Sequence, residues 1–319
     1  WPMHPEAPKG TYPPLPYFND DKIVYSQPDQ TQFTKDFTNL AIDFIKEHKD
    51  ESFFVYVPHP MVHVPLHVSE EWDGATGLGL YADVVAEIDD GVGRIIDTVN
   101  ELGIEENTLI IFTSDNGPWI EKQLKGKGGN DAHYGTAGPL RGAKMMTWEG
   151  GVRVPTIVRW PGVVPAGKEN SEPATIMDLL PTFAKLGGGK VPADRIIDGR
   201  NIWPILNGKQ KSHPREAYYY YQMDQLQAVR SGDWKLFVAM DSKKRNWGKP
   251  EGKKELKLFN LAQDIHEDNN VATENPEVVK QLLAHAEAAR EDLGDVGRPG
   301  KGQRKAGWVE KASPRLLKK

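Results

Sequence analysis

The stretch Leu109-Ile110-Ile111-Phe112-Thr113-Ser114-Asp115-Asn116-Gly117 decides how the fold is interpreted. Its first half is apolar, β-branched and aromatic, which is typical of a strand buried on both faces inside a parallel sheet. Its second half consists of turn-forming residues that cannot continue the strand. Open α/β sheets bind ligands beyond the carboxyl ends of their strands. Asp115 and Asn116 lie at such an end, and their oxygens suit a hard cation. An Asx turn that only closes the strand is the alternative.

The segments around this stretch predict further α/β units. Apolar residues recur with helical spacing, and short apolar runs follow the helices. In the first helix the expected apolar stripe is Phe37, Leu40, Ala41, Phe44 and Ile45. A helix that leads into a buried strand is half of a βαβ unit, so the order predicts a mostly parallel sheet. The expected elements are a helix over 31–48, a buried strand over 53–57, a helix over 81–102 ended by Gly103, strands over 108–113 and 154–160, and a helix over 175–186.

Two loops follow the predicted strands and carry polar side chains. Residues 59–67 hold three histidines between prolines, and such a braced loop can hold an imidazole rigidly. A surface loop with incidental histidines is the alternative. Residues 114–151 form a long glycine-rich loop with regularly placed Arg and Lys. Loops of this length in compact domains are usually functional or disordered, and the aromatic and basic residues here favour function.

The character of the chain changes near residue 210. Short strands are expected over 217–221, 226–230, 234–238 and 256–259, which predicts a small antiparallel sheet. A helix then begins after Asn275, the expected cap, with Pro276 in its first turn. The last residues are basic and are interpreted as a solvated tail. We therefore expect an α/β core over 1–210 and a smaller subdomain over 211–319; the first 30 residues are expected to be irregular.

Composition excludes several classes of protein. The chain has 319 residues, a net charge of −5 and no cysteine. Disulfides, thiolate metal sites and thiol nucleophiles are therefore excluded, and the charge gives no general attraction to nucleic acid. No apolar run approaches the roughly 20 residues that a membrane-spanning helix requires.

Four motifs in order resemble those of a known family. They are His63, then Ser114-Asp115-Asn116-Gly117, then Gly138-Pro139-Leu140-Arg141-Gly142-Ala143-Lys144, then Trp148-Glu149-Gly150-Gly151-Val152-Arg153-Val154-Pro155. In this order the chain resembles sulfatases of the arylsulfatase type, in the alkaline phosphatase superfamily. The likeness extends to residues 199–206 and 226–235. It implies an α/β fold with a mostly parallel central sheet flanked by helices, and a small C-terminal antiparallel sheet plus helix.

The resemblance also implies an activity and roles for individual residues. The implied reaction is hydrolysis of a sulfate ester on a sulfated small molecule or glycan, with Ca²⁺, or Mg²⁺, as the cation. Asp115 and Asn116 match metal ligands, Lys144 matches a lysine that contacts the sulfate, and His63 matches the histidine that protonates the leaving oxygen. His133 is expected to line the substrate pocket. A periplasmic or secreted location is implied by the same resemblance.

The chain departs from the family pattern at the nucleophile. The family uses a formylglycine made within Cys/Ser-x-Pro-x-Arg. The Ser-x-Pro triplets of this chain begin at Ser26, Ser171 and Ser212, and none is followed by an Arg two residues after the Pro. The Asp-Asp pair of first metal ligands is also missing. Both precede residue 1 in the family pattern. We therefore expect the 319 residues alone to bind calcium weakly and to be inactive, and to need an N-terminal companion fragment or to self-associate.

Two other functions stay open. One is a phosphomonoesterase or phosphodiesterase of the same superfamily, although such enzymes usually carry more His and Asp ligands. The other is a non-catalytic binding protein descended from a sulfatase. A Cys/Ser-x-Pro-x-Arg motif in the upstream reading frame would favour the enzyme.

Overall fold

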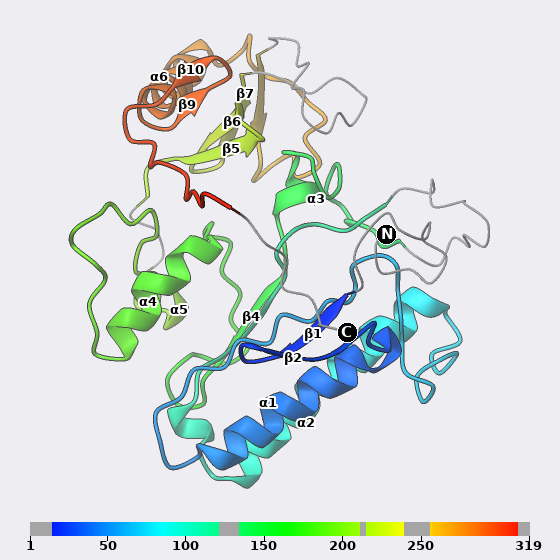
Figure 1. The fold of residues 1–319 in the computed structure, drawn as a ribbon. Coiled ribbons are helices and arrows are strands. Elements are labelled where there is room, and N and C mark those ends of the chain that lie inside the picture. Colours follow the sequence, from blue (N-terminus) through cyan, green and yellow to red (C-terminus); the bar gives the residue numbers. More distant parts are fainter. Residues whose placement is uncertain (1–14, 121–133, 211–214, 239–255, 312–319) are drawn as a thin grey trace. The chain divides into compact units, whose positions relative to one another are not determined.

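The structure, a computed structural model, describes residues 15–120, 134–210, 215–238 and 256–311. The chain folds into two compact units (Figure 1). The first unit comprises residues 1–105, 119–135 and 306–319, and the second comprises residues 106–118 and 136–305. The short 3₁₀ turn η2 (Glu105–Asn107) lies where the chain passes from the first unit into the second. The division at residue 210 stays a prediction.

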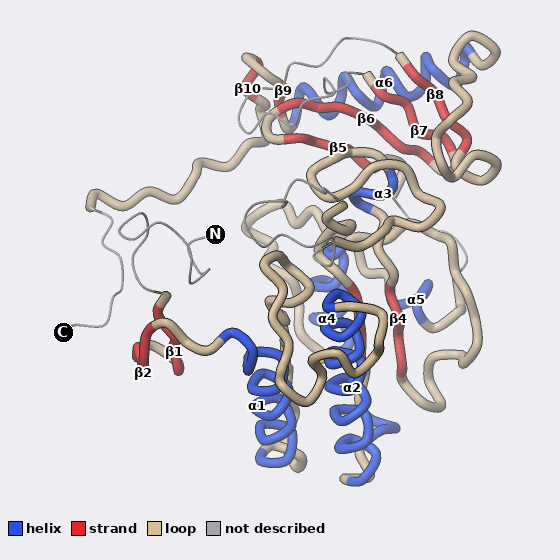
Figure 2. The backbone as a smooth tube through the Cα atoms, turned by 90° about the vertical axis from the view of Figure 1, so that its right-hand side faces the viewer, coloured by secondary structure: helices blue, strands red, loops and turns tan. Residues whose placement is uncertain are grey.

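The first unit is built on two long helices that lie side by side (Figure 2). Both helices were expected, and both are confirmed. A hairpin precedes them in a segment that the sequence predicted to be irregular, so that prediction is wrong. The elements are β1 (Pro16–Asn19), β2 (Lys22–Ser26), η1 (Gln30–Gln32), α1 (Phe33–Glu47) and α2 (Leu80–Glu101).

Small residues allow α1 and α2 to approach closely. A Cβ on Gly91 of α2 would lie 2.6 Å from Thr38 Oγ1 of α1, so only glycine fits there. The buried face of α1 carries Thr38, Ala41 and Ile45, whereas Leu40 is 57% exposed. The predicted apolar stripe of this helix was therefore partly wrong, because Leu40 lies off the face that meets α2.

The buried strand expected over 53–57 is not formed. These residues lie in no sheet of the described chain, and Phe54 and Tyr56 are 70% and 77% exposed. An internal strand requires hydrogen-bonding neighbours along its edges, and no described strand pairs with this segment. The apolar composition was interpreted correctly as β-favouring, but composition cannot supply the neighbouring strand.

The second unit contains three sheets and the remaining described helices. All of its strand pairs are antiparallel in the described residues, so the mostly parallel central sheet stays a prediction. Its elements before residue 210 are β3 (Ile110–Thr113), α3 (Glu149–Val152), β4 (Thr156–Arg159), η5 (Ile176–Asp178), α4 (Leu179–Leu186) and α5 (Trp203–Leu206).

Strand β3 was expected to be buried on both faces and is not. It pairs with β4 with Phe112 opposite Ile157, and these side chains are 39% and 63% exposed. Two strands alone cannot cover both of their faces.

The small antiparallel sheet and its helix are confirmed. Figure 1 shows α6 lying over one face of the sheet, where the buried cluster includes Leu236, Leu258 and Leu282. Trp148 packs on the other face against Phe237 and Phe259. The elements are β5 (Tyr218–Gln222), β6 (Gln225–Ser231), β7 (Trp234–Phe237), β8 (Lys257–Asn260), α6 (Pro276–Asp292), β9 (Gly294–Asp295) and β10 (Arg298–Pro299).

The cap expected for α6 is different in detail. Asn275 occupies the cap position but makes no side-chain cap bond, since its Nδ2 donates to the Val271 carbonyl at 2.9 Å. Pro276 stands in the first turn as expected.

Asp178 organises the start of α4. Its carboxylate accepts from the Thr175 amide at 2.8 Å, the Arg200 amide at 2.7 Å and Arg215 Nη2 at 2.8 Å. Burial acts to raise the pKa of Asp178, but these hydrogen bonds outweigh it and hold the pKa below its ordinary value.

Candidate functional site

The turn after β3 presents two oxygen ligands. Asp115 is exposed, and no described residue gives its carboxylate a hydrogen bond or an ion pair. Asn116 Nδ2 donates to the Gly117 carbonyl at 3.0 Å, which leaves the amide Oδ1 as the outward acceptor. Ser114 Oγ donates to the Asn116 carbonyl at 3.1 Å and closes the turn. A free carboxylate beside a fixed amide oxygen suits a hard cation.

Glycines hold this turn against the loop that carries Lys144. The Gly117 amide donates to the Gly151 carbonyl at 3.0 Å, and a Cβ on Gly117 would lie 1.8 Å from the Gly150 carbonyl oxygen. A Cβ on Gly150 would lie 2.6 Å from the Arg141 carbonyl oxygen, and one on Gly151 would lie 2.1 Å from another carbonyl. Only glycine allows three backbone segments to meet this closely. We call this set, Gly117, Gly150 and Gly151, the glycine junction.

Lys144 lies beside the same turn. Its amide donates to the Pro118 carbonyl at 3.0 Å. The backbone of Lys144 is therefore fixed against Pro118, which follows Asn116 by two residues. The described residues offer its ammonium no ion pair, and the side chain is half-buried. The second unit therefore brings together the segments of three predicted site residues, Asp115, Asn116 and Lys144.

His63 belongs to the first unit. Its Nδ1 lies 2.7 Å from the Val64 carbonyl oxygen, so Nδ1 donates and Nε2 faces away from that contact. Met61 and Leu66 anchor the loop in a buried cluster with Val84 of α2. The resemblance implies that His63 meets Asp115 and Lys144 at one edge of the sheet, and this convergence stays a prediction. His133 lies outside the described residues.

The structure distinguishes two of the three histidines in the 59–67 loop, His59 and His63. His63 is exposed, whereas His59 is partly buried, and burial lowers the pKa of His59. The Nδ1 atom of His59 is buried without a hydrogen-bond partner among the described residues. Burial disfavours the protonated form of His59, so the exposed His63 is the better candidate acid of these two.

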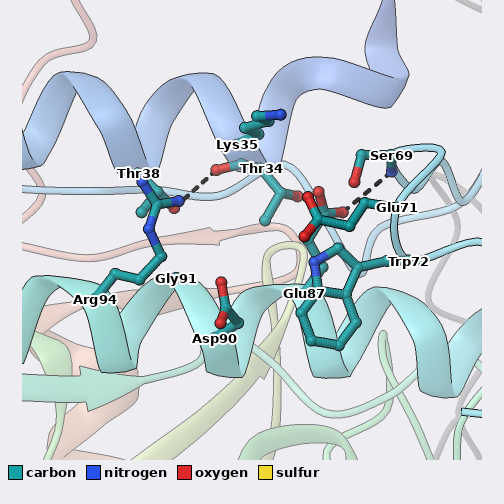
Figure 3. A pocket seen from close by; sticks show the side chains of 10 residues that line it. All are labelled: Thr34, Lys35, Thr38, Ser69, Glu71, Trp72, Glu87, Asp90, Gly91 and Arg94. Atoms are coloured by element: carbon teal, nitrogen blue, oxygen red, sulfur yellow. Dashed lines mark hydrogen bonds between the residues drawn. The ribbon is translucent and has the colours of Figure 1, made fainter. Parts of the chain in front are cut away.

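A small cavity lies between α1 and α2 (Figure 3) and is not the candidate site. Its volume is about 30 Å³, which suits one water molecule rather than a substrate. Ser69, Glu71 and Glu87 line it together with Thr34, and Glu87 Oε2 accepts from the Ser69 amide at 3.4 Å. None of the predicted site residues borders it.

The described part of the chain contains no cluster of three or more His, Cys, Asp or Glu side chains able to hold a metal ion. As predicted ligands, Asp115 and Asn116 would supply part of a cation's oxygen set rather than all of it. Among the helices that the structure describes, none is both long and apolar enough to cross a membrane.

The family model described as Sulfatase matches residues 7–189, more than half of the chain. The chain belongs to the sulfatase family. A second model, described as N-sulphoglucosamine sulphohydrolase, C-terminal, matches residues 142–292 of the chain.

Individual relatives agree with the family. Steryl-sulfatase of Rattus norvegicus is 38% identical over 224 residues, which is 68% of this chain and 38% of that protein. N-acetylgalactosamine-6-sulfatase of Mus musculus is 36% identical, covering 69% of this chain and 41% of that protein. The solved PsFucS1 sulfatase from Pseudoalteromonas sp. is 26% identical with a TM-score of 0.70, covering 84% of this chain and 56% of that one. The chain thus spans about two fifths of the length of these two curated relatives and little more than half of the solved one.

Sequence reasoning missed the role of three residues that fix the loop over residues 141–151. We call this loop, which carries Lys144, the site loop. Lys235, Glu149 and Glu267 form a buried ionic cluster on the Trp148 side of the small sheet. One signal was available: Lys235 stands between Trp234 and Leu236 in a short apolar strand, where an unpaired lysine would be costly. Glu267 gives no comparable signal, because it lies in a polar loop.

Proposed function

We propose that this protein hydrolyses sulfate esters. The observation that supports it most is the Asp115 carboxylate, which no described residue pairs and which the glycine junction holds beside the backbone of Lys144. A sulfate ester carries anionic oxygens and develops charge on its leaving oxygen as the S–O bond breaks. A cation site next to a lysine suits that charge distribution.

The proposed roles follow from the donor and acceptor chemistry of each side chain. Asp115 and Asn116 Oδ1 would hold a divalent cation, Ca²⁺ or alternatively Mg²⁺, which when bound polarises the sulfate oxygens. Lys144 would place its ammonium on the sulfate and the leaving oxygen. His63 would donate a proton from Nε2 to that oxygen, because Nδ1 is engaged with the Val64 carbonyl. His133 would line the substrate pocket.

The ligand and nucleophile sets extend beyond these residues. Ca²⁺ takes about six to eight oxygens, so water, substrate or further protein oxygens would complete the sphere around Asp115 and Asn116. A formylglycine nucleophile is part of the proposal, and the 319 residues contain no Cys/Ser-x-Pro-x-Arg motif to supply it. The nucleophile would then come from a companion segment.

Names of related proteins suggest the substrate class. They include steryl-sulfatase and N-acetylgalactosamine-6-sulfatase, and one solved structure is described with neocarrahexaose. We therefore propose a sulfated small molecule or glycan, without nucleic acid as a partner. A periplasmic or secreted location fits extracellular glycans. The mostly parallel central sheet of the family is proposed for the whole protein.

The test is to express residues 1–319 in frame with any coding sequence that precedes residue 1. Turnover of a chromogenic aryl sulfate and of the matching aryl phosphate is measured with Ca²⁺ and with chelator. We expect sulfate hydrolysis that Lys144→Ala and His63→Ala each reduce by at least about a hundredfold. Preferential phosphate hydrolysis would favour the phosphoesterase, and turnover of neither ester would favour the non-catalytic protein.

A further inference from the structure

A fully buried lysine lies beneath the loop that carries Lys144. Lys235 of β7 is 0% exposed, and its Nζ donates to Glu149 Oε1 at 2.9 Å and to the Thr147 carbonyl at 2.7 Å. Nζ also lies 2.9 Å from Glu267 Oε1, although that contact is an ion pair without hydrogen-bond alignment. The Tyr220 ring centre lies 4.4 Å from Nζ. Lys235 therefore binds the site loop at two positions, Thr147 and Glu149, which flank Trp148.

Glu149 joins the lysine to the start of α3. Its Oε2 lies 3.5 Å from Arg230 Nη1, and its amide donates to Glu267 Oε2 at 2.8 Å. The buried part of the cluster thus pairs two carboxylates, Glu149 and Glu267, with two cations, Lys235 and Arg230; the more exposed Arg153 Nη1 also lies 3.9 Å from Glu149 Oε2. Glu267 has a φ of +61°, a conformation that side-chain-bearing residues rarely adopt. Its carbonyl accepts from Arg141 Nη1 at 2.9 Å. The strained residue therefore contacts the site loop through its main chain at Arg141 and through its side chain at Glu149.

The same loop forms the glycine junction. Gly150 and Gly151 directly follow Glu149, and the Gly151 carbonyl accepts from the Gly117 amide at 3.0 Å. Gly117 in turn follows Asn116. A continuous series of contacts and chain neighbours therefore runs from Lys235 through Glu149 to the turn that holds Asp115 and Asn116. Thr147, whose carbonyl accepts from Lys235 Nζ, lies three residues after Lys144 in the same loop.

Buried ion networks are weak sources of stability, because apolar residues of similar volume often stabilise a fold as well or better. What a balanced network specifies is geometry. We propose that Lys235, Glu149 and Glu267 form a positioning network that keeps Lys144 and the Asp115–Asn116 turn at fixed positions relative to each other. Its effect on turnover rests on the proposed function, whereas its effect on loop order does not.

The test compares two variants that each disturb a buried ion pair of the second unit. Lys235→Met with Glu267→Gln removes one cation and one anion, so Glu149 stays matched by Arg230. Arg215→Met is the control, because it breaks the buried Arg215–Asp178 pair, whose N–O distance is 2.8 Å, without touching the site loop. Amide hydrogen exchange over residues 115–118 and 141–151, calcium affinity by calorimetry, and kcat and KM for an aryl sulfate are measured below both melting temperatures.

We expect exchange over both segments to rise in the double variant and not in the control. Calcium affinity and kcat should fall by about 10–100-fold, as for residues that orient ligands, with KM changed less than kcat. Equal exchange in the two variants would overturn the proposal. If the wild type hydrolyses no sulfate ester, the proposed function fails, while exchange still decides the network. Glu267→Gln alone replaces the double variant if that does not fold.

Discussion

Substitution of Gly117 by alanine should disrupt the site without removing a functional group. The new Cβ would lie 1.8 Å from the Gly150 carbonyl oxygen and 3.0 Å from Gly151 Cα. Non-bonded carbon contacts lie near 3.5 Å, so one backbone must move by roughly 1.5 Å. That movement cannot be absorbed by a rotamer change, because every atom in the way belongs to the main chain.

The magnitude follows from two losses. Overpacking costs about 1–3 kcal/mol, and loss of the Gly117–Gly151 hydrogen bond costs about 1 kcal/mol more. At roughly 2–4 °C per kcal/mol for a domain of this size, Tm should fall by about 4–16 °C. Calcium affinity should fall as well, because Asn116 precedes the displaced residue.

Circular dichroism against temperature, with calorimetric calcium titration at low temperature, measures both effects. The matched control is Gly93→Ala in α2, where, apart from its chain neighbours and the backbone of its own helix, no described atom lies within 4 Å of the added Cβ. That change should stabilise by up to about 1 kcal/mol, since alanine favours the helix. A Gly117→Ala protein that melts within about 1 °C of wild type, with unchanged calcium binding, would refute the reasoning.

Three further predictions concern other parts of the chain. Asp178→Asn should lower the free energy of unfolding by about 3–5 kcal/mol, because Arg215 loses its buried partner. Burial raises the pKa of Asp178 but its hydrogen bonds lower it more, so its contribution is full above the unfolded value near 3.8 and is lost as pH falls through the folded pKa. The deficit of the variant in urea should therefore shrink below about pH 4, and a constant deficit would argue against this. Ile157→Thr should reduce self-association in size-exclusion chromatography with mass detection, because Ile157 and Phe112 are paired and exposed; a monomeric wild type would contradict this. Asp115→Asn should weaken calcium binding by about tenfold or more, whereas Asp233→Asn, outside the site, should not.

Local patterns predicted most helices and the small sheet. The spacing of apolar residues in 81–102 specified α2, and Gly103, with a φ of +68°, ends it as expected. These features depend on neighbours within a few turns, which a single sequence shows directly. The burial of Leu40 was predicted wrongly because it depends on which face meets α2.

Long-range pairing was beyond the sequence. Residues 53–57 have a strand composition, yet a strand exists only where another backbone lies beside it. The Lys144 loop was recognised from its motif, but its attachment through Lys235 and Glu267 joins residues more than eighty positions apart. Glu267 in particular resembles any surface glutamate in sequence, and only the fold buries it against Lys235.

A crystal structure with Ca²⁺ and inorganic sulfate tests the central claim most directly. The protein for it is residues 1–319 expressed with any coding sequence that precedes residue 1. We predict a calcium ion bound by Asp115 and Asn116 Oδ1 at about 2.3–2.6 Å, with Lys144 Nζ and His63 Nε2 both contacting one sulfate beside it. A calcium ion bound elsewhere, or His63 and Lys144 on opposite faces of the protein, would contradict the account.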